Sequence, residues 1–401
     1  MKKYLKYGFI MFIILIFLFT IPSFAAQKES GMQSSSWIAI MIITTSVLGI
    51  VLSFLLWHKY GDDDPIVKIE FRYAPENLNT AELCFFYNGE TEIKDIMTLF
   101  VYLATKGYLK IEQYDENVLF TKDKTFKIVK LKEYDGKNVV EKEFFDELFK
   151  CGKDFVTEND LINKFYKPVY KIDNKLESKK NRKKIFDENG NKKGTLVLIL
   201  GLLVYAFCTF IPLFDIYGNT AIAKCALCGV FQIFGIYILL NSKVYIFNKI
   251  FSLFAKIYYY LIALIFIMGP AMYIILGLNG YTTYLISYVI GLVRFVIIMS
   301  INKFMTKRTK YGTEILGKIE GFKEFIESIS DSDIEMMMKE NKNYFYDILP
   351  YTYIFNYADT WFEKFESKEL SKPEWYECEG EFELKELKEE LKYLINLPLL
   401  G

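Results

Sequence analysis

The residues of this sequence that could take part in catalysis or metal binding include six cysteines and one histidine. Cys225 and Cys228 form a CxxC pair, a spacing that redox and zinc sites use in polar, exposed settings with further ligands nearby. Here the pair opens an apolar segment, which favours packing of two small side chains. His58 is the single histidine, so one chain cannot supply a histidine-based metal centre or catalytic triad.

Two cationic residues lie within long apolar segments and form a candidate intramembrane polar site, because charges are costly in a bilayer. Lys224 lies near the outer end of its segment and can extend its side chain to the interface. Arg294 lies about two turns from the inner end of its segment. Its side chain either reaches the inner interface or makes a buried polar contact. The apolar segments contain no Asp or Glu, which disfavours an ion-coupled transporter.

Near the C-terminus, Met336, Met337, Met338 and Trp361 form a candidate interaction surface. Methionine side chains adapt to many partners, although a cluster of this kind is more often used for packing. A Gly-rich phosphate loop, a Gly-x-Ser-x-Gly motif and metal-ligand spacings are absent from the sequence. These patterns predict a protein that is not an enzyme and needs no cofactor.

The distribution of apolar residues indicates an integral membrane protein. The chain has 401 residues, 52% of them hydrophobic, and its formal net charge is zero. The apolar residues gather in long blocks, and Lys, Glu, Asp and Asn fill the stretches between them. Because the chain has no net positive charge, its charge gives no reason to expect nucleic-acid binding, and nucleic acid is a disfavoured partner. Membrane lipid is the expected partner of the apolar blocks.

The N-terminus has the order of a secretory signal. Lysines precede an apolar run from 9 to 19, and small residues follow at Ser23 and Ala25. We expect residues 1–26 to be a signal peptide, cleaved or retained as an anchor, and residues 27–36 to be a short extracytoplasmic segment.

Five uncharged or nearly uncharged segments are long enough to span a bilayer. They are residues 37–57, 195–214, 221–240, 257–277 and 281–301. Lysine and arginine gather at 179–184, 241–256 and 301–310, whereas 215–220 and 278–280 contain neither. The positive-inside rule therefore places residues 58–192 and 302–401 in the cytoplasm of a multi-pass protein of the bacterial cytoplasmic membrane.

The portion 58–192 has the pattern of a winged helix. Asn79 or Thr80 can cap a helix from Ala81, residues 91–107 have helical spacing of apolar residues, and Gly107 can end that helix. Short strands follow at 108–112, 118–120 and 126–129, with a turn at 115–117. This α+β, winged-helix-like fold serves DNA binding or protein contacts. Acidic residues at the start of the second helix favour protein contacts.

The pattern of apolar residues in 302–401 predicts a helical cytoplasmic domain. Residues 311–328 have an apolar face, and residues 381–396 place leucines on one stripe of a charged helix. That last helix is either a partner-binding tail or a further layer of the domain.

Four motifs in this chain resemble the DUF2207, or YciQ-like, family of predicted bacterial membrane proteins. They are RYAPENLNTAEL at 72–83, ATKGYLKI at 104–111, RTKYGTEILGKIEGFKEFI at 308–326 and LPYTYIFNYADTWFEKF at 349–365. Thr352 stands where the family pattern usually has Ala. The resemblance implies a large exported β-sandwich before the first span and a two-helix central hairpin. Here residues 27–36 occupy the place of that sandwich, and the membrane region has two more spans. The resemblance implies no catalytic residues.

The sequence thus favours a non-enzymatic scaffold or adaptor that presents cytoplasmic domains to an unidentified protein partner. The alternatives are a transporter or channel component and a membrane-tethered winged-helix transcription regulator.

Overall fold

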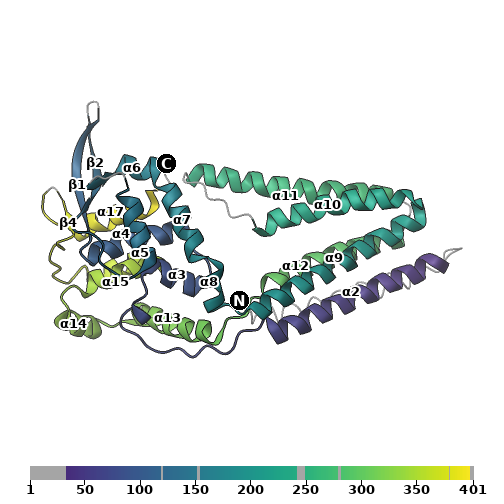
Figure 1. Cartoon of the computed structure of the whole chain (residues 1–401), viewed down its shortest axis with the longest axis horizontal. Helices are drawn as coiled ribbons and strands as arrows, with labels where there is room; N and C mark the ends of the chain where they lie inside the picture. Colours follow the sequence, from purple (N-terminus) through teal and green to yellow (C-terminus); the bar gives the residue numbers. More distant parts are fainter. Residues whose placement is uncertain are drawn as a thin grey trace. The chain divides into compact units, whose positions relative to one another are not determined.

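A computed structural model describes residues 33–118, 121–150, 154–241, 249–278, 281–378 and 380–397. The predicted signal peptide and residues 27–32 lie outside the described residues. The chain divides into two compact units, and the labels of their elements are those of Figure 1. Unit 1 contains the segment up to Asp63, Phe186–Ser242 and Ile257–Arg308, and unit 2 consists mainly of Asp64–Ile185 and Thr309–Gly401.

Unit 1 is made of long apolar helices. They are α2 (Gln33–Tyr60), α9 (Glu188–Tyr217), α10 (Thr220–Asn241), α11 (Lys249–Gly277) and α12 (Thr282–Lys303). Four stretches in α2, α10, α11 and α12 are long and apolar enough to cross a membrane: Ile40–Tyr60, Thr220–Ile238, Ile257–Gly277 and Thr282–Asn302. They confirm that the protein has membrane-spanning character. The expected span at 195–214 lies within α9, where the side chains of residues 204, 207 and 208 are not described, and it stays a prediction.

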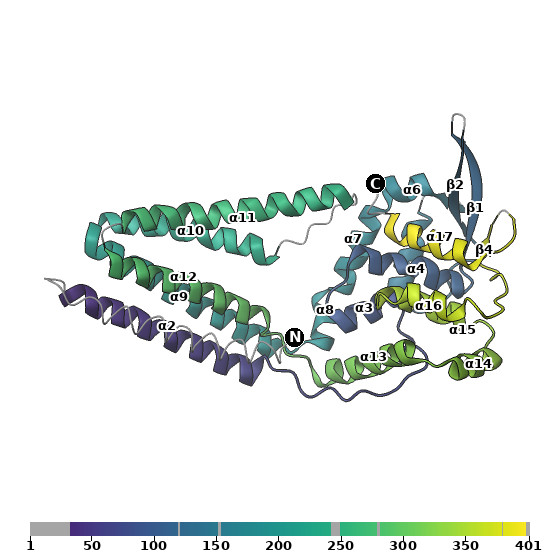
Figure 2. The ribbon, with the colours of Figure 1, turned by 180° about the vertical axis from the view of Figure 1, so that it is seen from behind.

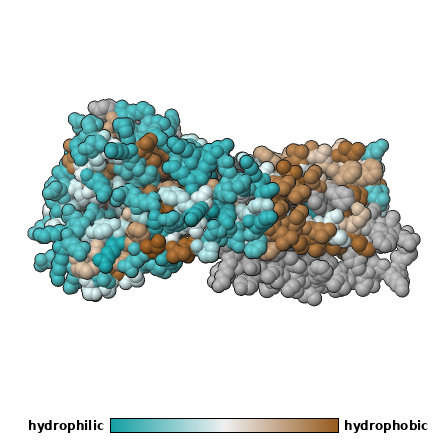
Figure 3. Space-filling view, turned by 60° about the horizontal axis from the view of Figure 1, so that its bottom comes forward, coloured by the Kyte–Doolittle hydropathy of each residue, from teal (hydrophilic) through white to brown (hydrophobic). Residues whose placement is uncertain are grey.

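Small residues let the helices of unit 1 approach closely. A Cβ atom added at Gly201 of α9 would lie 2.7 Å from Ile298 of α12, and one at Gly235 of α10 would lie 2.8 Å from the carbonyl oxygen of Ala263 in α11. In lipid, where apolar side chains gain nothing by leaving their solvent, this close contact is a main source of helix association. Figure 3 shows hydrophobic side chains gathered over the apolar helices and a mostly hydrophilic surface elsewhere.

Unit 2 is a mixed α+β structure. Its elements in the first portion are η1 (Pro75–Asn77), α3 (Thr80–Asn88), α4 (Ile93–Thr105), β1 (Leu109–Val118), β2 (Thr121–Lys130), α5 (Val139–Leu148), β3 (Phe155–Thr157), α6 (Glu158–Lys164), α7 (Tyr166–Leu176) and α8 (Lys179–Ile185). The second portion adds α13 (Lys310–Ser328), α14 (Asp331–Glu340), α15 (Tyr344–Ile354), α16 (Ala358–Phe365), β4 (Tyr376–Glu377) and α17 (Leu384–Asn396).

Local signals in the first portion are largely confirmed. Asn79 caps α3 by accepting a hydrogen bond from the backbone N–H of Glu82, and Gly107 follows α4 with a φ of 74°. The turn expected at 115–117 is wrong, because β1 continues to Val118 and pairs with β2 throughout. The register sets Asp115 opposite Lys124 and Asn117 opposite Lys122.

The two portions expected as separate domains fold together in unit 2. The sheet has the strand order β3-β2-β1-β4, and β4 from the second portion pairs in parallel with β1 through Ile111 and Tyr376. Helix α4 packs against α3, α15 and α17, so it lies at the centre of the unit (Figure 2). Each portion therefore supplies part of the core of the other.

Candidate functional site

Arg294 lies inside unit 1. It projects from α12, only 1% of its surface is exposed, and its Nη1 lies 3.4 Å from the hydroxyl oxygen of Ser46 in α2. Ser46 in turn donates to the carbonyl oxygen of Ile42 at 2.6 Å. Of the two alternatives for Arg294, the structure therefore shows the buried polar contact. A guanidinium with a hydroxyl acceptor on a neighbouring helix links α2 to α12.

Lys224 occupies a different place in unit 1. Its Nζ lies 3.7 Å from the centroid of the Tyr217 ring, a cation–π contact between α10 and the end of α9. The Tyr217 hydroxyl donates to the carbonyl oxygen of Gly277 at 2.7 Å. Within the described residues, no hydrogen bond or ion pair joins Lys224 to Arg294. The two predicted residues thus serve separate helix contacts.

A buried amide in α10 was not singled out by sequence reasoning. Gln232 has no exposed surface, and it donates to the Tyr288 hydroxyl at 2.9 Å and to the carbonyl oxygen of Ile267 at 3.3 Å. It also accepts a hydrogen bond from the Tyr205 hydroxyl. The network joins α9, α10, α11 and α12. Its signal in the sequence was a lone amide within an apolar segment, where a polar group needs a partner on another helix.

The Cys225–Cys228 pair contributes to packing in unit 1. Cys228 is buried in a cluster with Leu213, Ala221 and Ile274, and Cys225 packs against that cluster. Across the described ranges, no group of His, Cys, Asp and Glu side chains is arranged to hold a metal ion. His58 is exposed, and its Nδ1 lies 3.4 Å from a carboxylate oxygen of Asp62.

Two of the four residues proposed as an interaction surface lie in the core of unit 2. Trp361 has no exposed surface, and its indole N–H donates to the carbonyl oxygen of Phe345 at 3.2 Å. Met337 is 1% exposed, whereas Met336 and Met338 are partly exposed. Burial removes Trp361 and Met337 from the candidate surface, because a partner cannot reach them without unfolding the domain.

Helix α4 is the helix that a winged-helix pattern would use to read DNA. Every residue from Asp95 to Ala104 in α4 is buried. The helix is covered by α15 and α17 from the second portion of the chain. Over Asp95–Ala104 the helix therefore has no side chain free to reach base edges in a major groove.

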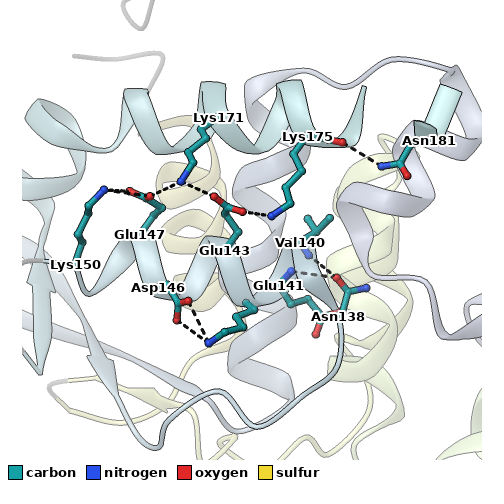
Figure 4. Close-up of polar contacts among 11 residues, drawn as sticks. Asn138, Val140, Glu141, Glu143, Asp146, Glu147, Lys150, Lys171, Lys175 and Asn181 are labelled. Atoms are coloured by element: carbon teal, nitrogen blue, oxygen red, sulfur yellow. Dashed lines mark hydrogen bonds and ion pairs between the residues drawn. The ribbon is translucent and has the colours of Figure 1, made fainter. Parts of the chain in front are cut away.

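Helices α5 and α7 face one another across a row of alternating charges (Figure 4). Lys171 of α7 contacts Glu143 at 2.6 Å and Glu147 at 2.9 Å, and Lys175 forms an ion pair with Glu143. Lys150 adds a contact to Glu147 at 3.1 Å. Hydrogen bonds from the lysines lower the pKa of Glu143 and of Glu147, and the bond from Lys171 has the largest effect on each. This row orients two helices.

An apolar strip lies exposed along α13. In the extended segment before η1, Ile66, Val67 and Ile69 are all exposed, Val67 by 73%. A Cβ atom at Gly317 would overlap the carbonyl oxygen of Val67, and one at Gly321 would overlap that of Ile69. The segment therefore lies directly on the helix backbone with its carbonyl oxygens inward. We call Ile66, Val67 and Ile69 the exposed strip.

A small pocket lies where the family motif at 349–365 packs against α4 and α17. Its volume is about 240 Å³, and its lining includes Lys94, Tyr353, Asn356, Asp359, Lys388 and Lys392. Asp359 already pairs with Lys388 at 2.9 Å. Asn356 has a φ of 55°, in the left-handed region that non-glycine residues seldom adopt. The motif thus forms a turn whose Asp359 is paired with Lys388 of α17.

Comparison with known proteins yields one match. A search of curated proteins finds no significant match, and a search of solved structures finds none. The model for the predicted membrane protein (DUF2207) C-terminal domain matches residues 68–365. This range includes most of unit 2 and the apolar helices α9 to α12. Together with the apolar helices and the placement of the four motifs, this match shows that the chain belongs to the DUF2207 family of predicted membrane proteins.

Proposed function

We propose that this protein is a non-enzymatic membrane adaptor whose unit 2 binds a partner protein in the cytoplasm. The exposed strip is the observation that carries the proposal. Soluble surfaces seldom leave several large aliphatic side chains exposed side by side unless they contact something. Here Ile66, Val67 and Ile69 are exposed within four residues of chain.

The backbone beneath the strip supports a binding role because it is held in place. The N–H of Ile69 donates to the carbonyl oxygen of Gly317 at 3.4 Å, and Lys68 pairs with Glu324 at 2.6 Å. A partner would therefore meet an extended segment that is already ordered, so binding loses less conformational entropy. An extended segment of this kind suits a partner that contributes apolar side chains and backbone hydrogen bonds.

The membrane helices support an anchoring role for the rest of the chain. The candidate spans are rich in exposed apolar side chains, and the polar groups of Arg294 and Gln232 hold helices together. The placement of lysine and arginine beside the spans supports a cytoplasmic position for unit 2.

The test is affinity purification of tagged full-length protein from crosslinked cells, reading both co-purified proteins and DNA. We expect a reproducible set of proteins with the wild type and loss of that set with Val67→Asp, which places a charge in the strip. Tyr170→Asp is the matched control, because Tyr170 is exposed on α7 away from the strip.

An unchanged protein set with Val67→Asp would contradict the strip as the contact. Enriched, discrete DNA fragments would instead favour a membrane-tethered regulator.

A further inference from the structure

A groove in unit 2 lies between the sheet and α17. Its volume is about 340 Å³, within the size range of small-ligand sites. Gln113, Thr125 and Phe126 line it from β1 and β2, where Gln113 and Phe126 are register partners. Glu386, Glu389, Glu390 and Tyr393 line it from α17.

Gln113 presents a buried acceptor in this groove. The residue is 6% exposed, and its Nε2 donates to Glu386 at 3.3 Å. Its Oε1 is buried and has no hydrogen-bond partner within the part of the chain that the structure describes. A buried acceptor without a donor destabilises the structure. A ligand that donates a hydrogen bond to this acceptor would remove that penalty, and its binding would be strengthened accordingly. Such a ligand must carry N–H or O–H groups.

The charges of α17 are segregated to different sides of the helix. Lys388 and Lys392 approach Asp359 at 2.9 Å and 3.9 Å, on the side of α16. The glutamates of the lining face the groove instead. On the sheet, Lys127 pairs with Glu112 at 2.9 Å, and both alternate to the strand face opposite Gln113 and Phe126. The charged residues that line the groove are therefore all acidic, and Glu390 among them accepts a hydrogen bond from the Tyr376 hydroxyl.

Aromatic rings form the other part of the lining. Phe126 and Tyr393 meet edge to face with their centroids 6.1 Å apart. The Tyr393 hydroxyl donates to Glu158 at 2.5 Å, and Thr125 donates to the other oxygen of that carboxylate at 2.8 Å. Carboxylates beside aromatic faces attract cations with an organic body. The described carboxylates do not converge as metal ligands do, which favours an organic cation over a metal ion.

We infer that this groove binds an organic cation, an ammonium or guanidinium group carried on an aliphatic chain. Its N–H groups would donate to Gln113 Oε1 and to the α17 carboxylates, while its chain lies against Phe126 and Tyr393. The group could be supplied by a free small amine or by a lysine or arginine side chain of a polypeptide. The inference goes beyond the adaptor role and does not depend on the exposed strip.

The test is isothermal titration calorimetry on the full-length protein in nanodiscs. The probes are cadaverine and agmatine for a free amine and a trilysine peptide for a polypeptide source. We expect saturable binding by at least one probe, weakened at least about tenfold in Glu386→Gln/Glu389→Gln. The matched control is Glu381→Gln/Glu383→Gln, which removes the same charge from exposed positions near the start of α17 and should bind as the wild type does.

Further arms separate the sources and keep the inference falsifiable. Tighter binding of trilysine than of either amine would assign a polypeptide segment, and the reverse order a free amine. Phe126→Leu keeps every charge and should also weaken binding, which provides a second variant if the double one fails to fold. 1-Pentanol, which lacks the charge, should not bind. Binding of no cationic probe at about 10 mM, a concentration that would nearly saturate a site of millimolar affinity, would overturn the inference. Equal binding by the double variant and its control would also overturn it.

Discussion

At the scale of single residues, two glycines of α13 decide how the segment before η1 lies. Gly317 and Gly321 leave the helix backbone uncovered, and the carbonyl oxygens of Val67 and Ile69 occupy the space that side chains would take. Glycine inside a helix normally lowers helix stability by about 1 kcal/mol relative to alanine. Here the two glycines allow an extended segment to lie in direct contact with the helix backbone, which a side chain at either position would prevent.

Gly321→Ala should destabilise unit 2 despite the better helix propensity of alanine. The added methyl group would overlap the carbonyl oxygen of Ile69, so the segment must shift. We expect the free energy of unfolding to fall by about 1–3 kcal/mol, the usual effect of overpacking. Chemical unfolding of the purified protein followed by tryptophan fluorescence would measure it.

Gly229→Ala is the control for that substitution. Gly229 is also helical, but a Cβ there meets nothing within 4 Å. Its replacement should leave stability unchanged or slightly raised. Equal effects of the two substitutions would show that the contact with Ile69 is not the constraint.

At the scale of elements, the charge row between α5 and α7 joins helices that are separated by β3 and α6. Glu143 and Glu147 lie on one side, and Lys171 and Lys175 contact them from the other (Figure 4). The carboxylates are 15% and 12% exposed, whereas the lysines remain partly in solvent. Ion pairs of this type contribute modestly, and their main effect is to set the relative orientation of two helices.

The stability contributed by this row should depend on pH. Lys171 and Lys175 lower the pKa of Glu143 in the folded state below its unfolded value of about 4.3. The contribution is therefore complete above that unfolded value and is lost as pH falls through the folded pKa. We expect Glu143→Gln to lower the unfolding temperature at pH 7 and to match the wild type in acid, below the folded pKa.

Asp146→Asn provides the comparison for Glu143→Gln. Asp146 pairs with Lys142 at 3.2 Å, and both side chains are more than half exposed. Its removal should change the unfolding temperature little at either pH, because solvent screens exposed pairs. A Glu143→Gln difference that persists in acid would assign the effect to packing.

At the scale of the whole molecule, the described sequence passes between its two units at Asp63–Asp64, Ile185–Phe186 and Arg308–Thr309, and again within α11 at Lys256–Ile257. The membrane helices of unit 1 thus alternate in sequence with the portions that make unit 2. Basic residues at 179–184 and 307–310 adjoin two of these passages. From the positive-inside rule, we propose that unit 2 lies on the cytoplasmic side.

Cysteine labelling in intact cells would test this orientation. Asn219 is exposed between α9 and α10, and Ser332 is exposed in α14. We expect a membrane-impermeant maleimide to label Asn219→Cys in intact cells and Ser332→Cys only after permeabilisation. Labelling of Ser332→Cys in intact cells would reverse the proposed topology, with the wild-type protein as the background control.

Much of the local structure could be predicted from short stretches of sequence. The helices with apolar spacing, the cap at Asn79, the glycine end at Gly107 and the apolar spans all depend on neighbours within a few residues. Such interactions act wherever the chain is placed, so the sequence alone determines them. The prediction of a turn at 115–117 was wrong because the conformation of these residues is set by pairing with the facing strand β2, not by their neighbours in sequence.

The amino-acid sequence by itself determined that this is a membrane protein of the DUF2207 family with capped, amphipathic helices in its polar portions. Only the tertiary structure decided that β4 completes the sheet beside β1, that Trp361 is core, and that Arg294 and Gln232 find partners on other helices. It alone assembled the acidic groove from β1, β2 and α17. The physical reason is separation: these contacts join residues far apart along the chain, and no local pattern specifies which distant surface will cover them.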